Sequence, residues 1–494
     1  MNYGMKRIDL YIIILCACAQ GLLSCAENET WTLDTSARLS FSNDSIVFDT
    51  LLSTIPSATK TLTVYNPNRD GIRLPAVHLQ QGSSSHFRVN VDGQYLAGGV
   101  GEDFEIRGED SLIVRVEVTL PPTGAETPVG FSDLLLFQLE SGVVQSVVLT
   151  AGGQDALFLR GEILSADTTY DSPLPIVIYD SLVVREGVTL TLQAGTTLMF
   201  HDKASLQVYG TLVALGTLEK PVTLRGDRTD HMFPYLPYDN TPSRWEGVHL
   251  HETSRENRLS YTDLHSGCYG IICDSTDLNV SLLEMENCIV HNIGGDGLQL
   301  NNCRATVRNS QVSNTMGRCV SLFGGAYLFE HCTLAQFYPF TAGRGEALYV
   351  ANHEGETFRD LVQAHFLNCV ITGYGEDVIM GSINEGQDEE VNYLFSHCFL
   401  NTVESDDEKR FVEVRYDHLP EGKEAGDEEQ LLREKNFKLF DTKNFLYDFT
   451  PDSLSLIRDM AEPELARQLP FDRLGRSRLS DDAPDAGCLE YTKE

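Results

Sequence analysis

Acidic side chains recur at one position of a repeated pattern in the middle of this chain. They are Asp296, Glu346, Glu376 and Asp377, with Arg318 at the equivalent position of another repeat. Paired carboxylates can act as acid and base on a glycosidic bond, and clustered carboxylates beside a cationic base suit Ca²⁺-dependent lyase chemistry. We expect Asp296, Glu346 and Asp377 to line one edge of the fold as candidate binding residues. Turn positions favour such residue types without any function, so no catalytic residue is assigned.

A four-residue phrase repeats around these positions. It occupies residues 287–290, 309–312 and 331–334, at steps of 22 and 22 residues, and returns at 368–371 and 397–400. A second short run of alternating apolar residues lies between successive copies. Runs this short are typical of strands rather than helices. Self-similarity at this period predicts a solenoid in which each repeat is one coil of a parallel β-helix, with about ten coils in all.

Stacked coils place equivalent residues in rows along the solenoid. The second residue of each phrase is small, and we expect it to form an internal file of Cys288, Ser310, Cys332, Cys369 and Cys398. The preceding residue would form a ladder at the bend, where polar side chains can bond backbone groups that the turn leaves unpaired; the ladder is Asn287, Asn309, His331, Asn368 and His397.

The spacing of the cysteines argues against disulfides and against a cysteine metal site. Coils lie about 4.8 Å apart, so Cys288 and Cys332, two coils apart, are too distant to bridge. Only Cys332–Cys369 or Cys369–Cys398 remain plausible in the file, which we expect to be mainly reduced. There is no Cys-x-x-Cys motif, and the sequence predicts no metal and no other cofactor.

The N-terminus has the pattern of an export signal. Lys6 and Arg7 precede a short apolar run that ends in Leu-Leu-Ser-Cys at Cys25, which predicts a signal peptide over residues 1–24. The ending resembles the bacterial lipobox, which implies a lipidated Cys25 and a tether over residues 25–32. Acidic residues directly after Cys25 resemble the surface-export signal of Bacteroidetes lipoproteins. This resemblance implies a lipid anchor in the outer membrane, with the protein at the cell surface.

Residues 33–160 alternate between apolar and polar positions over about seven short runs separated by polar turns. The runs are 38–41, 45–48, 59–65, 87–91, 111–120, 133–139 and 143–151. This pattern predicts a β-sandwich. The early run 61–67 and the closing run 147–153 resemble the immunoglobulin-like domains of the ASH (HYDIN) type. The segment contains no cysteine, so its core must hold without a disulfide.

Residues 182–200 and 206–217, with the run 245–250, resemble the right-handed parallel β-helix of the pectate-lyase-like superfamily, as found in Bacteroidetes lipoproteins. The resemblance implies an all-β chain with the β-helix over residues 165–440 and a C-terminal cap over 441–494. In that cap we expect Arg478 to pair with Asp485 or Glu490. The resemblance is poor for activity, since the catalytic phrases of the hydrolases in that superfamily are not found.

Insertions leave the stack at 227–244, 341–360 and 404–435. Long loops on a rigid scaffold are where binding residues usually lie. The first insertion is rich in aromatic residues, so Tyr235, Tyr238 and Trp245 are candidate binding residues. Trp245 is better explained as a packing anchor between coils than as a ligand platform.

The composition is strongly acidic, with 37 Lys and Arg against 72 Asp and Glu. This balance excludes nucleic acid as an expected partner, since phosphate binding needs clustered cations. We expect a non-catalytic cell-envelope lipoprotein that displays a β-helix surface to a glycan or a surface protein. The alternatives are a polysaccharide lyase or glycoside hydrolase of the β-helix type and a structural envelope component.

Overall fold

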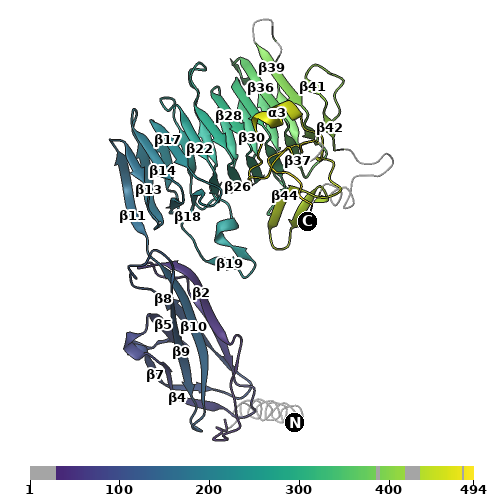
Figure 1. Ribbon diagram of the computed structural model, residues 1–494. Coiled ribbons are helices and arrows are strands. Elements are labelled where there is room, and N and C mark those ends of the chain that lie inside the picture. The colour runs from purple at the N-terminus through teal and green to yellow at the C-terminus, as the bar shows by residue number, and fades with distance from the viewer. Residues whose placement is uncertain (1–28, 385, 387–389, 418–433, 481–482, 494) are drawn as a thin grey trace, which may run out of the picture. The chain divides into compact units, whose positions relative to one another are not determined.

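The computed structural model describes residues 29–384, 386, 390–417, 434–480 and 483–493. The chain divides into two compact units, residues 1–154 and 155–494, and both are built almost entirely of strands (Figure 1). The predicted fold class, an immunoglobulin-like β-sandwich followed by a parallel β-helix, is confirmed. Cys25 and the predicted signal peptide lie outside the described residues. Within the described part, no helix is long and apolar enough to cross a membrane.

The first unit is a sandwich of two five-stranded sheets. One sheet has the order β1 (Ser40–Phe41), β3 (Lys60–Tyr65), β8 (Ser111–Val118), β5 (Phe87–Val91) and β6 (Gln94–Tyr95). The other has the order β2 (Ser45–Leu52), β10 (Val144–Gln154), β9 (Val129–Gln138), β4 (Ile72–Leu79) and β7 (Val100–Ile106). Two short 3₁₀ turns, η1 (Gly82–Ser84) and η2 (Ala97–Gly99), join strands at one end. Alternate residues such as Leu62, Val114 and Phe137 point inward and are fully buried.

The sandwich ends at Gln154 rather than at the predicted residue 160. The next strand, β11 (Leu157–Leu164), pairs in parallel with β13 (Ile176–Val184) and so belongs to the second unit. Both strands bend in mid-course, at Gly161 and Asp180, which have positive φ values of 57° and 65°. Each of these two strands therefore contributes to two sides of the solenoid: the part before the bend belongs to one side and the part after the bend to the other.

The second unit has three sheets that run along the solenoid, here called sheets I, II and III in the order in which each coil visits them (Figure 1). Sheet I has ten strands, which matches the predicted number of coils: β12 (Thr168–Tyr170), β14 (Thr189–Gln193), β17 (Thr211–Leu215), β22 (Asn257–Ser260), β25 (Leu283–Glu286), β28 (Arg304–Arg308), β31 (Gly325–Glu330), β36 (Leu361–Leu367), β39 (Val391–Ser396) and β41 (Phe411–Val412).

Sheets II and III continue from β11 and β13. Sheet II contains β15 (Thr197–Phe200), β18 (Val222–Gly226), β23 (Thr262–His265), β26 (Ile289–Ile293), β29 (Gln311–Thr315), β32 (Thr333–Gln336), β37 (Val370–Gly373), β40 (Phe399–Leu400) and β42 (Arg415–Tyr416). Sheet III contains β16 (Ser205–Val208), β21 (Gly247–Leu250), β24 (Ile271–Cys273), β27 (Leu298–Asn301), β30 (Val320–Phe323), β33 (Leu348–Ala351) and β38 (Ile379–Ser382).

Among the described residues of this unit, three hairpins and two short turns of helix with complete bounds lie outside these sheets. They are β19 (His231–Phe233) with β20 (Leu236–Pro237), β34 (His353–Glu354) with β35 (Thr357–Phe358), β43 (Phe437–Asp441) with β44 (Leu446–Pro451), the 3₁₀ turn η3 (Tyr238–Asn240) and the helix α3 (Pro463–Gln468).

The bend from sheet I to sheet II is made by one residue in the left-handed conformation. The five members of the predicted ladder have φ values of 59°, 46°, 51°, 54° and 53°, for Asn287, Asn309, His331, Asn368 and His397. Asn adopts this conformation more readily than most residues because its short side chain clashes little with the backbone. The residue after each bend points inward. The predicted file is therefore present, and the Sγ of each cysteine in it lies within hydrogen-bond distance of two backbone carbonyls, to one of which its S–H can donate.

All nine cysteines in the described part of the chain are unpaired, and Cys268 alone among them is not fully buried. Burial raises the pKa of the Cys288 thiol to about 12. Small thiols fit the file because they fill space as weakly polar groups and still satisfy their one donor.

The C-terminal segment was predicted to cap the end of the solenoid, but most of it runs along the side (Figure 1). It covers the bend between sheets I and II, where Asn368 exchanges hydrogen bonds with the backbone of Glu462 at 2.8 and 3.2 Å. The Asn309 amide donates to the carbonyl of Phe471 at 2.9 Å. Asn309 and Asn368 therefore bond this segment rather than the turn's own backbone. Outward apolar residues of sheet II explain the placement, because Val370 and Phe399 pack with Phe449 and Ile457.

Arg478 fixes this segment from a fully buried position. Its guanidinium pairs with Glu490, as predicted, and also donates to the side chain of Asn309 at 2.9 Å and to the carbonyl of Gly487 at 3.1 Å. The contact to Asn309 joins the segment directly to the ladder.

We expect the substitution Arg478→Ala to lower the free energy of unfolding by about 3–5 kcal/mol, because it leaves the Glu490 carboxylate buried without its partner. Chemical denaturation would measure the change. The matched control is Arg467→Ala, which removes the exposed pair with Glu464 and should cost only about 0–1 kcal/mol. Equal stability of the Arg478→Ala variant and the wild type would contradict the role of Arg478.

Candidate binding site

A cleft of about 430 Å³ lies over the middle of sheet II. Its floor is formed by Ile289 and His291 of β26 and by Gln311 and Ser313 of β29, which face outward in register on neighbouring coils. The cleft exists because sheet II is covered on either side of it. The insertion 227–244 contributes Asn240 to one wall, and the β43–β44 hairpin with the C-terminal segment forms the other.

The floor of the cleft carries several polar side chains. The Gln311 amide donates to the hydroxyl of Ser313 at 2.9 Å, and Asn292 and Asn314 add amide groups at the end of the same two strands. The Asn314 carbonyl oxygen is buried and has no hydrogen-bond donor among the described residues. Amides and hydroxyls both donate and accept, so the floor suits a ligand that is itself rich in hydroxyl groups.

A row of aromatic rings reaches the cleft at Phe445. The ring of Tyr235 lies 5.7 Å from Phe233 and 6.1 Å from Phe445, and Phe445 lies 4.9 Å from Phe340. These three contacts are stacked rather than edge-on. The rings come from three separate segments, and Phe445 also lines the cleft. Phe233 and Tyr235 are each 50% exposed, so the row offers large apolar faces to solvent.

Buried charges fasten the insertion 227–244 to sheet II. Asp239 of η3 receives hydrogen bonds from Arg225 and from Nε2 of His265, both at 2.8 Å. The other nitrogen of His265 bonds Asp263 at 2.8 Å, and Asp263 also contacts Nε2 of His291 at 3.2 Å. Burial opposes protonation, but Asp263 and Asp239 outweigh it and raise the pKa of His265 to about 9. Burial likewise opposes ionisation of Asp263, yet His265 and His291 hold its pKa well below the usual range.

The other two aromatic candidates of this insertion have structural contacts. The Arg228 guanidinium lies 3.9 Å from the ring of Tyr238, and Arg244 lies 5.7 Å from it, so Tyr238 stiffens the insertion. Trp245 is fully buried, stacks on Phe200 at 4.3 Å and donates its indole N–H to the carbonyl of His265 at 2.8 Å. Trp245 is thus a packing anchor and not a binding residue, since it presents no surface to a ligand.

The acidic candidates lie just before the strands of sheet III, and of these Asp296 lines a second hollow of about 350 Å³, together with Arg318. Asp296 accepts the backbone N–H of Arg318 at 2.8 Å and the hydroxyl of Ser321 at 2.7 Å. The Arg318 guanidinium bonds Glu346 at 2.9 Å. The structure therefore brings Asp296, Arg318 and Glu346 together, whereas Asp377 accepts the backbone N–H of Ile379 at 3.0 Å on the next coil.

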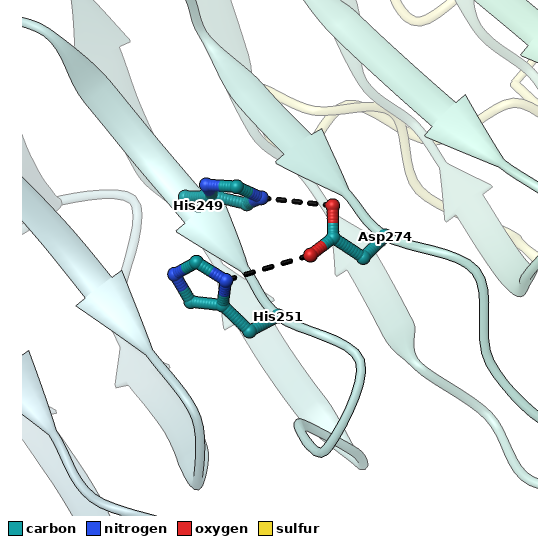
Figure 2. A group of neighbouring side chains, drawn as sticks. All are labelled: His249, His251 and Asp274. Atoms are coloured by element: carbon teal, nitrogen blue, oxygen red, sulfur yellow. Dashed lines mark hydrogen bonds and ion pairs between the residues drawn. The ribbon is translucent and has the colours of Figure 1, made fainter.

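Two groups of described side chains bring three potential metal ligands within 4.8 Å of one another. One is the set Asp263, His265 and His291 on sheet II, where protons already satisfy both nitrogens of His265. The other is the set His249, His251 and Asp274 on sheet III (Figure 2). Burial, followed by the neighbouring His249, lowers the pKa of His251.

These histidines were not predicted to lie together, because each group spans two coils. Asp274 follows His249 by 25 residues, about one coil, and His265 precedes His291 by about the same distance. Candidate ligands one coil apart in the same row are the signal that would have found them.

No protein-family model matches the chain, and no curated protein matches it. Among solved structures, the chain is similar to a protein of unknown function from Porphyromonas gingivalis W83, with 15% identity and a TM-score of 0.17 over 26% of this chain and 60% of that one. It is also similar to an ASH/PapD-like domain of human CEP192, with 16% identity and a TM-score of 0.16 over 26% of this chain and 92% of the domain.

A third similar structure is the catalytic unit of a GH87 α-1,3-glucanase from Streptomyces thermodiastaticus strain HF3-3. The identity is 11% and the TM-score 0.26, over 72% of this chain and 88% of that one. Likenesses at these values do not bear on function.

The charges that fasten the insertion predict a pH-dependent stability. Because the pKa of His265 is raised in the folded state, protonated His265 contributes to the free energy of unfolding. The contribution is complete below the pKa of unfolded histidine, about 6.5, and is lost as the pH rises through about 9. The lowered pKa of Asp263 contributes above its unfolded value of about 3.9 and is lost in stronger acid. We therefore expect the difference in melting temperature between the wild type and His265→Gln to be largest near pH 4–6.5 and to shrink by pH 9.5.

The control is His365→Gln, because the ring of His365 hydrogen-bonds the neutral side-chain amide of Asn392 at 3.2 Å. This variant should show no such trend. A difference between wild type and His265→Gln that stays constant from pH 5 to pH 9.5 would overturn the assignment of His265 as a buried cation.

Proposed function

We propose that this protein binds a neutral glycan in the cleft over sheet II and does not cleave it. The row of exposed aromatic rings beside a floor of amides and hydroxyls is the observation that carries the proposal. Exposed apolar surface of this kind, rimmed by polar groups, marks a ligand-binding groove in soluble proteins.

A sugar ring fits both parts of the site. Its flat faces carry C–H groups, which can lie against the electron-rich face of an aromatic ring such as Tyr235 or Phe445. Its hydroxyl groups both donate and accept, as do the side chains of Gln311, Ser313 and Asn240 along the floor and wall. The aromatic row extends beyond the cleft to Phe233 and Phe340, which favours a chain of several sugar units over a single one.

The charge of the protein favours a neutral polymer. With 72 acidic against 37 basic residues, the surface field repels polyanions at long range. Arg473 lies in the wall of the cleft, but the cleft also contains Asp448, so there is no cluster of cations for an acidic polymer.

The carboxylates near the cleft argue for binding without hydrolysis. Glycosidases place two carboxyl groups on either side of the scissile bond. Among the described lining residues, Asp448 is the only acid. Asp239 and Asp263 lie close by, but both are held by His265.

The alternative is a polysaccharide lyase or hydrolase that works on sheet III. It is favoured by one observation, namely that Asp296 and Glu346 flank Arg318 beside a second hollow. Arg318 bonds both carboxylates, Asp296 through its backbone N–H and Glu346 through its guanidinium, which leaves them less free to act on a substrate.

The test is incubation of residues 26–494 with a panel of neutral and acidic polysaccharides, with binding and chain cleavage followed together, with and without Ca²⁺. We expect binding to a neutral polymer, weakened about 2- to 10-fold by Tyr235→Ala or Phe445→Ala, from 0.5–1.5 kcal/mol per aromatic contact. The control is Tyr95→Ala, which removes an exposed ring of the β-sandwich, 56% exposed, and should leave binding unchanged.

Two other results would overturn this proposal. Cleavage that is lost in Asp296→Ala or Asp377→Ala would identify the enzyme on sheet III. If the protein neither binds nor cleaves any of the polysaccharides, the remaining possibilities are a protein partner and a structural role in the envelope.

We also propose that Cys25 carries a lipid that anchors the protein in the outer membrane, with the described units at the cell surface. The lipobox-like sequence and the acidic tether support this proposal. Metabolic labelling with palmitate, together with protease accessibility on intact cells, is the test. We expect label in the wild type and none in Cys25→Ser; equal labelling of both would contradict lipidation at this residue.

A further inference from the structure

The group His249, His251 and Asp274 lies on the outer side of sheet III, away from the cleft over sheet II. Leu250 of β21 pairs with Cys273 of β24, so His251 and Asp274 are the next residues on two neighbouring coils. His249 faces outward one position before Leu250. The parallel register thus brings two imidazoles of one coil against a carboxylate of the next, as Figure 2 shows.

The three side chains converge at the spacing of metal ligands. His249 Nε2 lies 2.9 Å from one oxygen of Asp274, and His251 Nδ1 lies 3.4 Å from the other. Ligand atoms around a tetrahedral ion with bonds of about 2.0–2.1 Å are about 3.3 Å apart. Small rotations of the three side chains are therefore enough to place one ion between them.

Neighbouring contacts fix the tautomer of His251, so that the nitrogen facing Asp274 carries a lone pair. The amide nitrogen of Gln207 donates to the hydroxyl of Ser205 at 2.9 Å, so the amide oxygen is left to accept from Nε2 of His251 at 2.7 Å. In the neutral ring, Nδ1 is then an acceptor, and it faces a carboxylate oxygen, which is also an acceptor. A cation between them resolves this opposition.

The support around His251 matches that of a metal-binding histidine. Such a residue usually donates its second ring N–H to an oxygen of the protein, which sets the tautomer and the direction of the ring. Gln207 supplies that oxygen. Tyr209 stacks on the ring at 3.9 Å and 3°, which limits its rotation.

The second group, Asp263, His265 and His291, differs in this respect. Both nitrogens of His265 already bond carboxylates, Asp263 on one side and Asp239 on the other. Protons complete that network without an ion. It therefore serves as an internal comparison for the group on sheet III.

We propose that His249, His251 and Asp274 bind one divalent transition-metal ion, with Zn²⁺ as the representative of the class. Two imidazoles and one carboxylate suit Zn²⁺, Co²⁺, Ni²⁺ or Cu²⁺, whereas Ca²⁺ and Mg²⁺ prefer oxygen ligands throughout. The side chains of His249 and Asp274 are 29% and 34% exposed, so three protein ligands leave at least one coordination position open to solvent.

An open position on this side faces the polar part of sheet III. Asn301 lines the 350 Å³ hollow and follows Leu300, which pairs with Cys273, so it occupies the coil after Asp274 in the same row. An oxygen donor on a ligand in that hollow is the group best placed to complete the coordination.

The experiment is calorimetric titration of metal-free residues 26–494, without a polyhistidine tag, with Zn²⁺ alone, and with Co²⁺ followed by its visible absorption. We expect one ion per chain. His251→Gln and Asp274→Asn should each abolish binding, while Gln207→Leu should weaken it about 10- to 100-fold, because it removes only the group that orients His251. All three positions lie on the outer surface of the coils, and circular dichroism would check that the variants fold.

Matched controls separate this site from the other candidates. His291→Gln alters the group on sheet II, and Cys268→Ser alters the one described cysteine that is not fully buried; neither should change the stoichiometry or the Co²⁺ spectrum. The proposal is overturned if Zn²⁺ does not bind at micromolar concentration, if Ca²⁺ binds instead, or if binding survives His251→Gln and is lost in one of the control variants.

Discussion

In the coils that carry the ladder, the chain must enter sheet II at the same point, and a single left-handed residue imposes this constraint. The bend at Asn309, with φ of 46°, turns the chain within one residue, so the next side chain points inward and the one after it begins a strand in register with its neighbours. A right-handed residue there would send the strand in another direction and break the parallel pairing on both sides. The inward file and the outward rows all follow from this repeated geometry.

Because the register is fixed, side chains about one coil apart in sequence become nearest neighbours. This places His265 against His291, and it brings the strand that carries His249 against Asp274. The insertion 227–244 does not disturb this order, since it leaves the stack after β18 and the chain returns at β21, which pairs with β16 in register. The predicted insertions 341–360 and 404–435 are interrupted by strands of the stack, namely β33 in the first and β41 and β42 in the second. The fold therefore builds polar groups from residues that no local motif joins.

Prediction from sequence succeeded where a pattern is local and repeated. The phrases at 287–290 and 309–312 predicted the bends, the file and the parallel coils because each copy supports the same interpretation. In the sandwich, the strands β4 and β7 were not predicted. β4 contains Pro75, which cannot donate to a ladder, and β7 reads Val-Gly-Glu-Asp-Phe-Glu-Ile, with three acids and a glycine that disfavour a strand. β4 pairs with β9 on one side and with β7 on the other, and this pairing overrides the local preferences of both strands.

The candidate cleft could not be predicted in the same way. Asn240, His291 and Phe445 meet there from three distant segments, and no periodicity in the sequence connects them. The position of the C-terminal segment could not be predicted from the sequence either, because it depends on which outward face of the solenoid remains apolar. Trp245, which the sequence favoured as a packing anchor with a ligand role as the other candidate, fills the core beside Phe200.

If the protein is exported to an oxidising compartment, as proposed above, the thiols of the file must be buried before they are oxidised. Once buried, these groups stay as thiols, because desolvation disfavours the thiolate that reacts with oxidants. Before burial they are ordinary reactive cysteines on a chain whose parallel pairings join residues far apart in sequence, and such pairings form slowly. A wrong disulfide between two coils would shift the register of everything that follows. In that compartment, coil stacking competes kinetically with oxidation. Early formation matters most for the central coils, where the cysteines are concentrated.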